Sequence, residues 1–302
     1  MSATRHRFLV KNEDAGLRLD QVLAARVPEF SRRKARALID LGGVFVDGAR
    51  VKVAGRVLKV GQEVVANVGS AFERATKETG KAARTKDEAH LPEFRIVYTD
   101  TDVCVVDKPA GLLTAPTPES DRGNLARMLA EHLGGAVFVV HRLDLGTSGL
   151  LVFARNQETN RALAEVFRAH NVERVYWAVL LGSPAWEEKT VTADVGGKSA
   201  ETTFKVLEMV GTKATLAMCT LKTGRTHQIR LHAAAVGFPV MGDKEHGTAS
   251  ALDPPRMALH ATVLGFVHPR TRQALRFESA WPDELGRWAE GLRSDKALGE
   301  RP

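Results

Sequence analysis

The sequence predicts an α+β protein in two parts, a small basic module followed by a larger domain that mixes strands and helices. A chain of 302 residues is long enough for one large or two moderate domains, and a hydrophobic share of 44% is enough to form cores. Apolar residues in the first quarter recur at helical spacing and then at strand spacing. From Glu93 onward, strand-like runs are separated by helical stretches.

The module, residues 17–68, is expected to begin with two helices. Leu19, Val22 and Leu23 recur at helical spacing, and Ser31 can cap a second helix that ends at Gly42-Gly43. Short strands are expected over residues 44–46, 51–53 and 64–68, with tight turns at residues 47–48 and at residue 61. The module therefore reads as two helices on a small sheet.

The formal net charge is +7 and the pI is about 9.5, with much of the excess in this module. Ten lysines and arginines stand against five acidic residues between positions 17 and 68. Several cations occupy the first turns of the second helix, where they do not complement the helix dipole; they are Arg32, Arg33, Lys34 and Arg36. This placement indicates a polyanionic ligand, the alternative being a solvated basic helix face.

Residues 69–92 are predicted to form a linker. From position 69 to position 91 the sequence is mainly Ala, Thr, Lys, Glu and Arg, without a sustained hydrophobic period. A stable helix is the competing interpretation, because Ala, Lys and Glu favour one locally. Pro92 would interrupt the segment in either case.

The second domain is expected over residues 93–290. Its strand-like runs are 96–98, 103–106, 137–140, 150–154, 176–181 and 215–221, and its helical stretches are 125–133, 159–169 and 226–235. No glycine-rich phosphate loop of the dinucleotide or P-loop type accompanies them. We therefore expect no nucleotide cofactor.

Composition also limits the cellular setting. The longest apolar runs fall far short of the roughly 20 residues that a membrane span requires, and the N-terminus has no apolar segment typical of a secretory signal. A cytoplasmic protein is expected. Cys104 and Cys219 lie in apolar runs without metal-ligand spacing, so we predict that both are small buried hydrophobic residues and that there is no metal site.

The most informative stretch is residues 141–149, HRLDLGTSG, which places one carboxylate in a turn before an apolar strand. If Asp144 is buried there, a nearby positive charge or hydrogen bonds must compensate. Arg142 is the nearest candidate in sequence, and Arg225 is the most interesting distant one. The stretch lacks the spacing and partner motifs of a kinase catalytic loop, and its Ser148 is not in the Gly-x-Ser-x-Gly setting of a hydrolase nucleophile.

Residues 141–149 resemble the active-site motif of the RluA-type family of RNA pseudouridine synthases. Three further segments agree in order: DVCVVDKPAGLLTA at 102–115, VYWAVLLG at 175–182 and LKTGRTHQIRLHAAAVGFPVMG at 221–242. The resemblance covers roughly residues 93–282. It implies a mixed, mainly antiparallel sheet with a central cleft, and site-specific isomerisation of uridine to pseudouridine in RNA without any cofactor. We expect a monomer.

The resemblance also implies residue roles. Asp144 would be the nucleophile, and Arg225 would pair with it and hold its pKa down. Uridine must be extruded from stacked RNA at a cost of a few kcal/mol, and Arg142 would fill the vacated space. Tyr176 would stack on the flipped base and help to deprotonate C5, and Leu259 would line the pocket. Packing roles for Tyr176 and Leu259, an Arg142–Asp144 pair and a phosphate-contacting Arg225 are the alternatives.

Other polar residues of these motifs are expected to be peripheral. Arg230, Lys222 and His227 are interpreted as surface phosphate contacts, and His141 as structural. The chain departs from the family pattern at residues 173–175, before the tyrosine, and at His246, where a tyrosine is usual. The chemical path stays open between attack on C1′, attack on uracil C6 and formation of a glycal.

Residues 17–68 resemble the S4 RNA-binding domain. The resemblance implies that the second helix and the adjoining hairpin hold structured RNA through its phosphates, without choosing the nucleotide. The expected contacts are Arg32, Arg33, Lys34, Arg36, Arg50 and Lys52. Ribosomal RNA is favoured over transfer RNA as the substrate. The alternatives are a tRNA pseudouridine synthase, a non-catalytic RNA-binding or ribosome-assembly factor, and a glycosidase that acts on free nucleosides.

Overall fold

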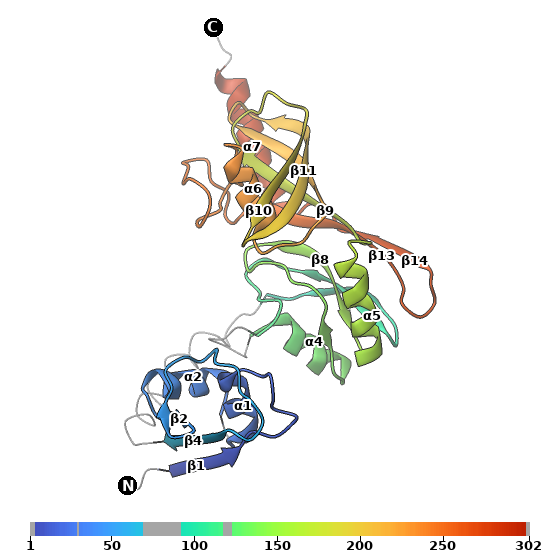
Figure 1. The fold of residues 1–302 in the computed structure, drawn as a ribbon. Coiled ribbons are helices and arrows are strands. Elements are labelled where there is room, and N and C mark those ends of the chain that lie inside the picture. The colour runs from blue at the N-terminus through green and yellow to red at the C-terminus, as the bar shows by residue number, and fades with distance from the viewer. Residues whose placement is uncertain (1–3, 29, 69–91, 117–122, 300–302) are drawn as a thin grey trace. The chain divides into compact units, whose positions relative to one another are not determined.

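The computed structural model describes residues 4–28, 30–68, 92–116 and 123–299. Within this part of the chain the residues form two compact units. The first contains the described residues up to position 68 together with 116 and 123–124, and the second contains 92–115 and 125–299. Figure 1 shows the helices and strands of both units as a ribbon. Each unit has its own hydrophobic core. The predicted linker lies outside the described residues except for Pro92.

The N-terminal unit packs two helices on a four-stranded antiparallel sheet of order β1-β4-β2-β3. Its elements are β1 (Thr4–Leu9), α1 (Leu19–Arg26), α2 (Arg32–Asp40), β2 (Val44–Val46), β3 (Ala49–Arg50) and β4 (Glu63–Val68). Strand β1, which lies before the predicted module, pairs along its whole length with β4. The sheet therefore begins earlier in the chain than the sequence predicts.

Local sequence signals account for most of this unit. Ser31 caps α2 as expected, because its Oγ accepts a hydrogen bond from the backbone N–H of Lys34 at 3.2 Å. The strand predicted at 51–53 is wrong by two residues. Asp47 and Gly48 both have positive φ, and this two-residue turn pairs Val46 directly with Ala49, so β3 begins there.

The larger unit is built on a ten-stranded sheet. Its strands are β5 (Arg95–Thr99), β6 (Val103–Lys108), β7 (Phe138–Val139), β8 (Ser148–Ala154), β9 (Glu173–Leu181), β10 (Glu188–Val195), β11 (Lys198–Val210), β12 (Ala214–Leu221), β13 (Leu259–Val267) and β14 (Ala274–Glu278). The main order is β10-β11-β12-β9-β13-β8-β6-β5, with β14 on β13 and β7 on β8. Only the β8–β13 pair is parallel among the described strands, which confirms the mixed, mainly antiparallel sheet.

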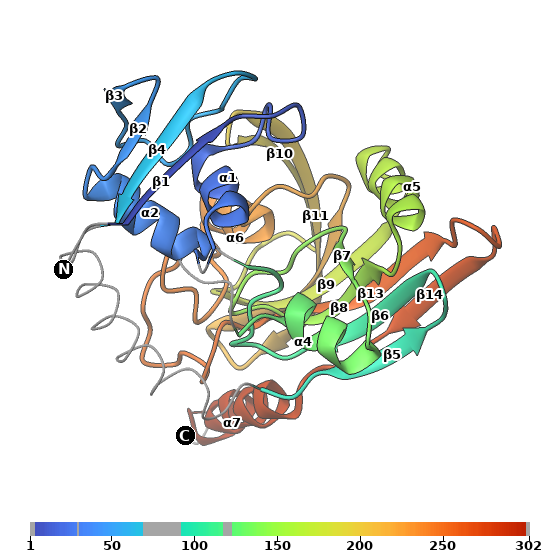
Figure 2. The ribbon, with the colours of Figure 1, turned by 90° about the horizontal axis from the view of Figure 1, so that it is seen from below.

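Four helices of this unit are described: α4 (Leu125–Leu133), α5 (Gln157–Arg168), α6 (Gln228–Ala235) and α7 (Asp283–Gly299). Helix α5 packs on β7 and β8, α6 packs on β10 and β11, and α7 packs on β11 (Figure 1). Figure 2 shows the same elements after a turn of 90°. All three predicted helices are present, with α4 at the predicted bounds. None of the described helices is both long and apolar enough to cross a bilayer.

The parallel β8–β13 pair brings two distant segments into close contact. Gly149 on β8 has φ of +111°, and a Cβ placed there would lie 2.3 Å from the carbonyl oxygen of Ala261 on β13. Only glycine allows this approach without a shift of the backbone. This close contact holds the end of the segment 141–149 against β13, which begins at Leu259. Both cysteines are fully buried in the same core, as predicted.

Candidate active site

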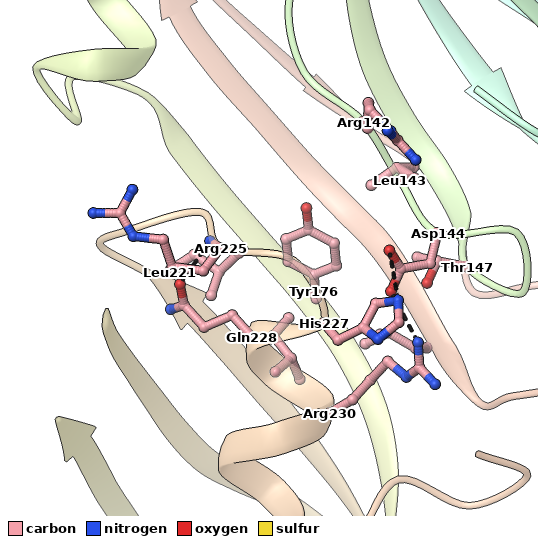
Figure 3. A pocket seen from close by; sticks show the side chains of 12 residues that line it. Arg142, Leu143, Asp144, Thr147, Tyr176, Leu221, Arg225, His227, Gln228 and Arg230 are labelled. Atoms are coloured by element: carbon pink, nitrogen blue, oxygen red, sulfur yellow. Dashed lines mark hydrogen bonds and ion pairs between the residues drawn. The ribbon is translucent and has the colours of Figure 1, made fainter. Parts of the chain in front are cut away.

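A pocket in the larger unit gathers residues from three of the four motif segments, and the segment 102–115 contributes none. It is lined by Arg142, Leu143, Asp144, Thr147, Tyr176, Leu221, Arg225, His227, Gln228, Ile229, Arg230 and Leu259 (Figure 3). These residues come from the turn before β8, from β9, from the end of β12 and the turn into α6, and from the start of β13. Every catalytic and substrate-binding candidate from the sequence lies in this lining.

The turn that carries Asp144 is held by the first motif segment. The Thr114 hydroxyl donates to the Leu143 carbonyl at 2.8 Å and accepts from the Leu143 N–H at 3.1 Å. The Gly111 N–H donates to the Leu145 carbonyl at 2.8 Å. Backbone groups on both sides of Asp144 are therefore fixed, and the carboxylate, whose side chain is 28% exposed, faces the pocket.

Lys108, the last residue of β6, is fully buried and supports the same segment. Its Nζ donates to the carbonyl oxygens of Pro109 at 2.9 Å and Leu112 at 2.8 Å. Burial lowers the pKa of Lys108 from 10.5 to about 7, although the negative charge of Asp144 opposes the shift. A neutral amine still has two N–H groups for these two carbonyls.

We expect Lys108 to make the stability of this unit pH-dependent. Between pH about 7 and pH about 10.5 the unfolded chain holds a proton on Lys108 that the folded chain has released, so the free energy of unfolding gains a contribution that rises with pH. Lys108→Met should remove it. The measurement is urea unfolding at several pH values, followed by tryptophan fluorescence, because all four tryptophans lie in this unit. Parallel pH profiles for the two proteins would contradict this.

Asp144 pairs with Arg230, a buried residue of α6. Arg230 Nη1 lies 3.3 Å from Asp144 Oδ2, and the same guanidinium binds both oxygens of Asp243 at 2.7 and 2.6 Å and Glu245 Oε2 at 3.0 Å. Burial alone would lower the pKa of Arg230, but the hydrogen bonds and charge of Asp243 outweigh it and raise that pKa. Arg230 is therefore a permanent cation beside Asp144.

This geometry corrects two expectations. The guanidinium of Arg225 points away from Asp144, and its Nε donates to the Ser199 carbonyl at 3.3 Å (Figure 3). Arg230, expected on the surface, is only 6% exposed. The reason is the start of α6: the Gln228 side chain accepts from the Arg225 N–H at 2.9 Å and fixes Arg225 in the preceding turn, outside the helix.

His227 also lies in the pocket and not at the surface. Its Nε2 is 3.7 Å from Asp144 Oδ1, and its side chain is 24% exposed. His227 is the residue before α6 and has left-handed backbone geometry, with φ of 56°, which is uncommon for a residue other than glycine. His227 and Arg230 are three residues apart, so they reach Asp144 from one side of the helix start.

The remaining candidates line the pocket without touching the carboxylate. Tyr176 on β9 is 8% exposed and Leu259 at the start of β13 is 3% exposed, so both form apolar wall. Arg142 is exposed and makes no ion pair with any described carboxylate, which leaves the alternative of an Arg142–Asp144 pair unsupported. His141 is structural, as expected: its Nε2 accepts from the Val152 N–H at 3.1 Å.

The chemistry of Tyr176 is restricted by its surroundings. Burial raises the pKa of Tyr176 to about 12, and the charge of Asp144 adds to the effect against the opposing charge of Arg174. The phenol therefore keeps its proton near neutral pH. In this state it can donate a hydrogen bond or stack on a base.

In the N-terminal unit the cations predicted to bind RNA differ in their surroundings. Arg36 and Arg32 surround the fully buried carboxylate of Asp20, at 2.8 and 3.8 Å, together with Arg18 at 3.0 Å. These arginines therefore compensate the buried Asp20 carboxylate, in addition to any role in binding a ligand. The second group consists of exposed side chains on α2 and the hairpin, which are Arg33, Arg50 and Lys52. Lys34 is partly buried.

Comparisons with known proteins agree with these features. A family model described as RNA pseudouridylate synthase matches residues 102–235, and an S4 domain model matches residues 17–64. An uncharacterized RNA pseudouridine synthase of Bacillus subtilis is 34% identical over 94% of this chain and 96% of its own length. Ribosomal large subunit pseudouridine synthase D of Nitrosomonas europaea is 34% identical over 93% of this chain and 86% of its own length.

Solved structures show the same fold. Human RNA Pseudouridylate Synthase Domain Containing 1 aligns with a TM-score of 0.54 at 24% identity, covering 68% of this chain and 97% of the human one. With relatives of this identity along almost its whole length, the chain belongs to the RluA-type family of RNA pseudouridine synthases, an isomerase with an N-terminal S4 domain.

Proposed function

We propose that this enzyme isomerises specific uridines in ribosomal RNA, with Asp144 as the nucleophile acting on a uridine that has been extruded from the RNA. One observation carries the proposal: Asp144 faces a pocket with apolar walls and is paired with the permanently charged, buried Arg230. Such a cation favours the ionised carboxylate that nucleophilic attack requires. The names of several relatives, which refer to the large ribosomal subunit, favour ribosomal RNA.

The reaction needs no external reagent. The N1–C1′ bond breaks, the detached uracil turns, and C5 bonds to C1′. The proton on C5 is released and N1 takes up a proton, so the product is an isomer of the substrate. Positive charge develops on the ribose as the first bond breaks, and the Asp144 carboxylate can trap or stabilise it. Tyr176 and Leu259 would enclose the uracil while it turns.

Arg142 is suited to occupy the space that the flipped uridine leaves. It is exposed, it lies two residues from the nucleophile, and no described carboxylate holds it. Its guanidinium is therefore available to stack on neighbouring bases, which offsets part of the few kcal/mol that extrusion costs.

The test is release of tritium from RNA labelled at uridine C5. Transcripts of the large ribosomal RNA, the small ribosomal RNA and a tRNA pool are incubated separately with the enzyme. We expect release from large-subunit RNA, and sequencing of the product locates the modified uridines. Release from tRNA alone would overturn the substrate, and no release from any RNA would overturn the activity.

The exposed cations of the S4 unit should supply affinity and not selectivity. We expect the triple variant Arg33→Gln, Arg50→Gln, Lys52→Gln to bind RNA more weakly and to lower the slope of log affinity against log salt by about 2 to 3. The modified position should not change, because phosphate contacts carry no sequence information. Filter binding at several salt concentrations measures this.

A charge-matched control separates local contacts from net charge. Lys189, Lys198 and Lys213 are exposed in the larger unit, and their triple change to Gln removes the same charge. An equal loss of salt dependence in this control would show that the S4 residues act only through net charge.

A further inference from the structure

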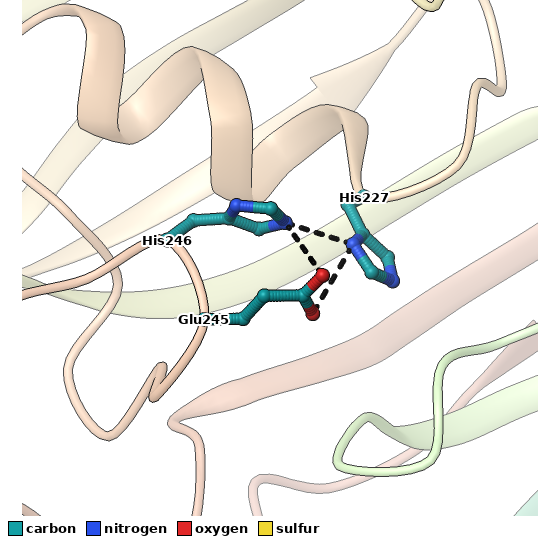
Figure 4. Close-up of side chains that lie close together, drawn as sticks. All are labelled: His227, Glu245 and His246. Atoms are coloured by element: carbon teal, nitrogen blue, oxygen red, sulfur yellow. Dashed lines mark hydrogen bonds and ion pairs between the residues drawn. The ribbon is translucent and has the colours of Figure 1, made fainter.

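Three potential metal ligands meet beside the pocket. His227 Nδ1 lies 2.8 Å from His246 Nε2 and 3.5 Å from Glu245 Oε2, and His246 Nε2 lies 3.6 Å from Glu245 Oε1 (Figure 4). His227 precedes α6, whereas the other two residues lie in the loop before β13. No metal-ligand spacing was apparent for these residues, because the fold brings Glu245 and His246 to His227 from 18 and 19 positions away.

The donor set is one that zinc accepts. Two imidazole nitrogens and one carboxylate oxygen are a known zinc environment, in which the fourth position stays open to water. Ligands at zinc bond lengths in a tetrahedron lie about 3.3 Å apart. The distances from His227 to Glu245 Oε2 (3.5 Å) and from His246 to Glu245 Oε1 (3.6 Å) are close to this value, but they end on different oxygens, so one imidazole would have to approach the oxygen that the zinc takes. The two ring nitrogens now share a hydrogen bond, and they would have to separate by about 0.5 Å.

The ligand loop is held in place before any metal arrives. Asp243, which is 5% exposed, accepts the N–H groups of Glu245 at 3.0 Å and His246 at 3.2 Å through one oxygen. Arg230 holds Glu245 through Oε2, which leaves Oε1 directed to His246. The left-handed backbone of His227 aims its ring into the same space.

His227 links this cluster to the nucleophile. Its Nδ1 faces the other two ligands, and its Nε2 faces Asp144 at 3.7 Å. A histidine that binds zinc through one ring nitrogen commonly donates the other N–H to a carboxylate, and this partner fixes the tautomer. Asp144 stands where that carboxylate is expected.

We propose that His227, Glu245 and His246 bind one Zn²⁺ ion and that this ion inhibits the enzyme; the inhibition rests on the function proposed above. With zinc on Nδ1, the His227 proton must lie on Nε2, directed at Asp144. The resulting hydrogen bond holds the carboxylate and lowers its nucleophilicity. The zinc itself does not touch Asp144, so RNA binding is not blocked.

A second group of potential metal ligands lies beyond the end of β13 opposite Leu259. Asp100, Asp102 and His268 also lie close together, but Arg270 pairs with Asp102, and backbone N–H groups already bind Asp100. The carboxylates of that group are therefore already bound by an arginine and by backbone N–H groups. In the proposed zinc site Arg230 also pairs with Glu245, but it does so through Oε2, which leaves Oε1 directed to His246.

Binding is tested first, without RNA. The full-length protein is freed of metal with a chelator and titrated with ZnCl₂ in a calorimeter. We expect the wild type to bind Zn²⁺ at one site. The affinity should fall by about 100-fold or more in His246→Phe and by about 10-fold or more in Glu245→Gln. The control His132→Phe, which changes an exposed histidine on α4, should keep the wild-type affinity. MgCl₂ should not compete, because Mg²⁺ prefers oxygen ligands.

Cobalt provides a spectroscopic check. Co²⁺ in a tetrahedral nitrogen and oxygen site gives visible absorption that an octahedral aqueous ion lacks, and His246→Phe should abolish it. No saturable Zn²⁺ binding by the wild type, or equal binding by His246→Phe, would overturn the site.

Inhibition is tested next by tritium release. Zn²⁺ should inhibit the wild type and His132→Phe at the concentration that fills the site, and His246→Phe only at concentrations about 100-fold higher. Stoichiometric binding without inhibition would overturn the regulatory role. If no RNA releases tritium but zinc still binds, the proposed reaction fails and the metal site stands.

Discussion

Asp144→Asn should reduce the rate of tritium release by about 10⁴-fold or more, because the amide keeps the shape of the side chain but is not a nucleophile. Arg230 and His227 can still contact the amide oxygen, so the pocket should stay intact. RNA affinity should remain equal or rise slightly, since one negative charge fewer faces the phosphates. Single-turnover rates with excess enzyme separate this chemical defect from product release.

The control for this variant is Asp194→Asn, which removes the same charge from an exposed position on β10. It should react at the wild-type rate. If Asp144→Asn retains more than a hundredth of wild-type activity, the carboxylate is not the nucleophile, and the pocket must act by positioning alone.

Arg230→Met should give the second-largest effect, a loss of about 10²- to 10³-fold in rate, comparable to that for other preorganised charge contacts in enzymes. Methionine keeps the apolar volume but removes the cation beside Asp144. It also leaves the nearly fully buried carboxylate of Asp243 without its partner, and we expect a loss of about 3–5 kcal/mol in the free energy of unfolding. Urea unfolding and tritium release measure the two effects.

Two further variants keep the Arg230 prediction decisive. Adding Asp243→Asn to Arg230→Met neutralises the stranded carboxylate and keeps an oxygen for the N–H groups of the ligand loop, so stability should recover while activity should not. Arg225→Met removes an arginine from the same motif that points away from Asp144. A greater catalytic loss in Arg225→Met than in the Arg230 variants would show that Arg225 pairs with Asp144 during the reaction.

The sequence predicted those elements whose signals are local. Helix α2 follows its Ser31 cap, and β8 follows from a continuous apolar run that is buried along its whole length. Strand β10 was not predicted in this way, since only Val191 and Val195 of its eight residues are buried and the alternation of apolar and polar residues is confined to its second half. Its place depends on pairing with β11, which is long-range information.

In the candidate site, too, some features could be predicted from the sequence and others depend on how the chain folds. The family resemblance implied that Asp144, Tyr176 and Leu259 belong to one site, and all three line the same pocket. The choice between Arg225 and Arg230 depended on where α6 begins. The helix starts two residues later than expected, after a histidine with left-handed geometry, and this difference turns Arg230 toward the carboxylate.

The double hydrogen bond of the Thr114 hydroxyl to Leu143 determines which partner must move when RNA binds. The N–H and the carbonyl of Leu143 are both engaged by this one oxygen, and the carbonyl of Asp144 accepts from the Thr147 N–H at 3.1 Å. These hydrogen bonds hold the backbone on both sides of Asp144 in place. In the proposed reaction the carboxylate therefore has a fixed support, and we expect the nucleotide to make the larger displacement.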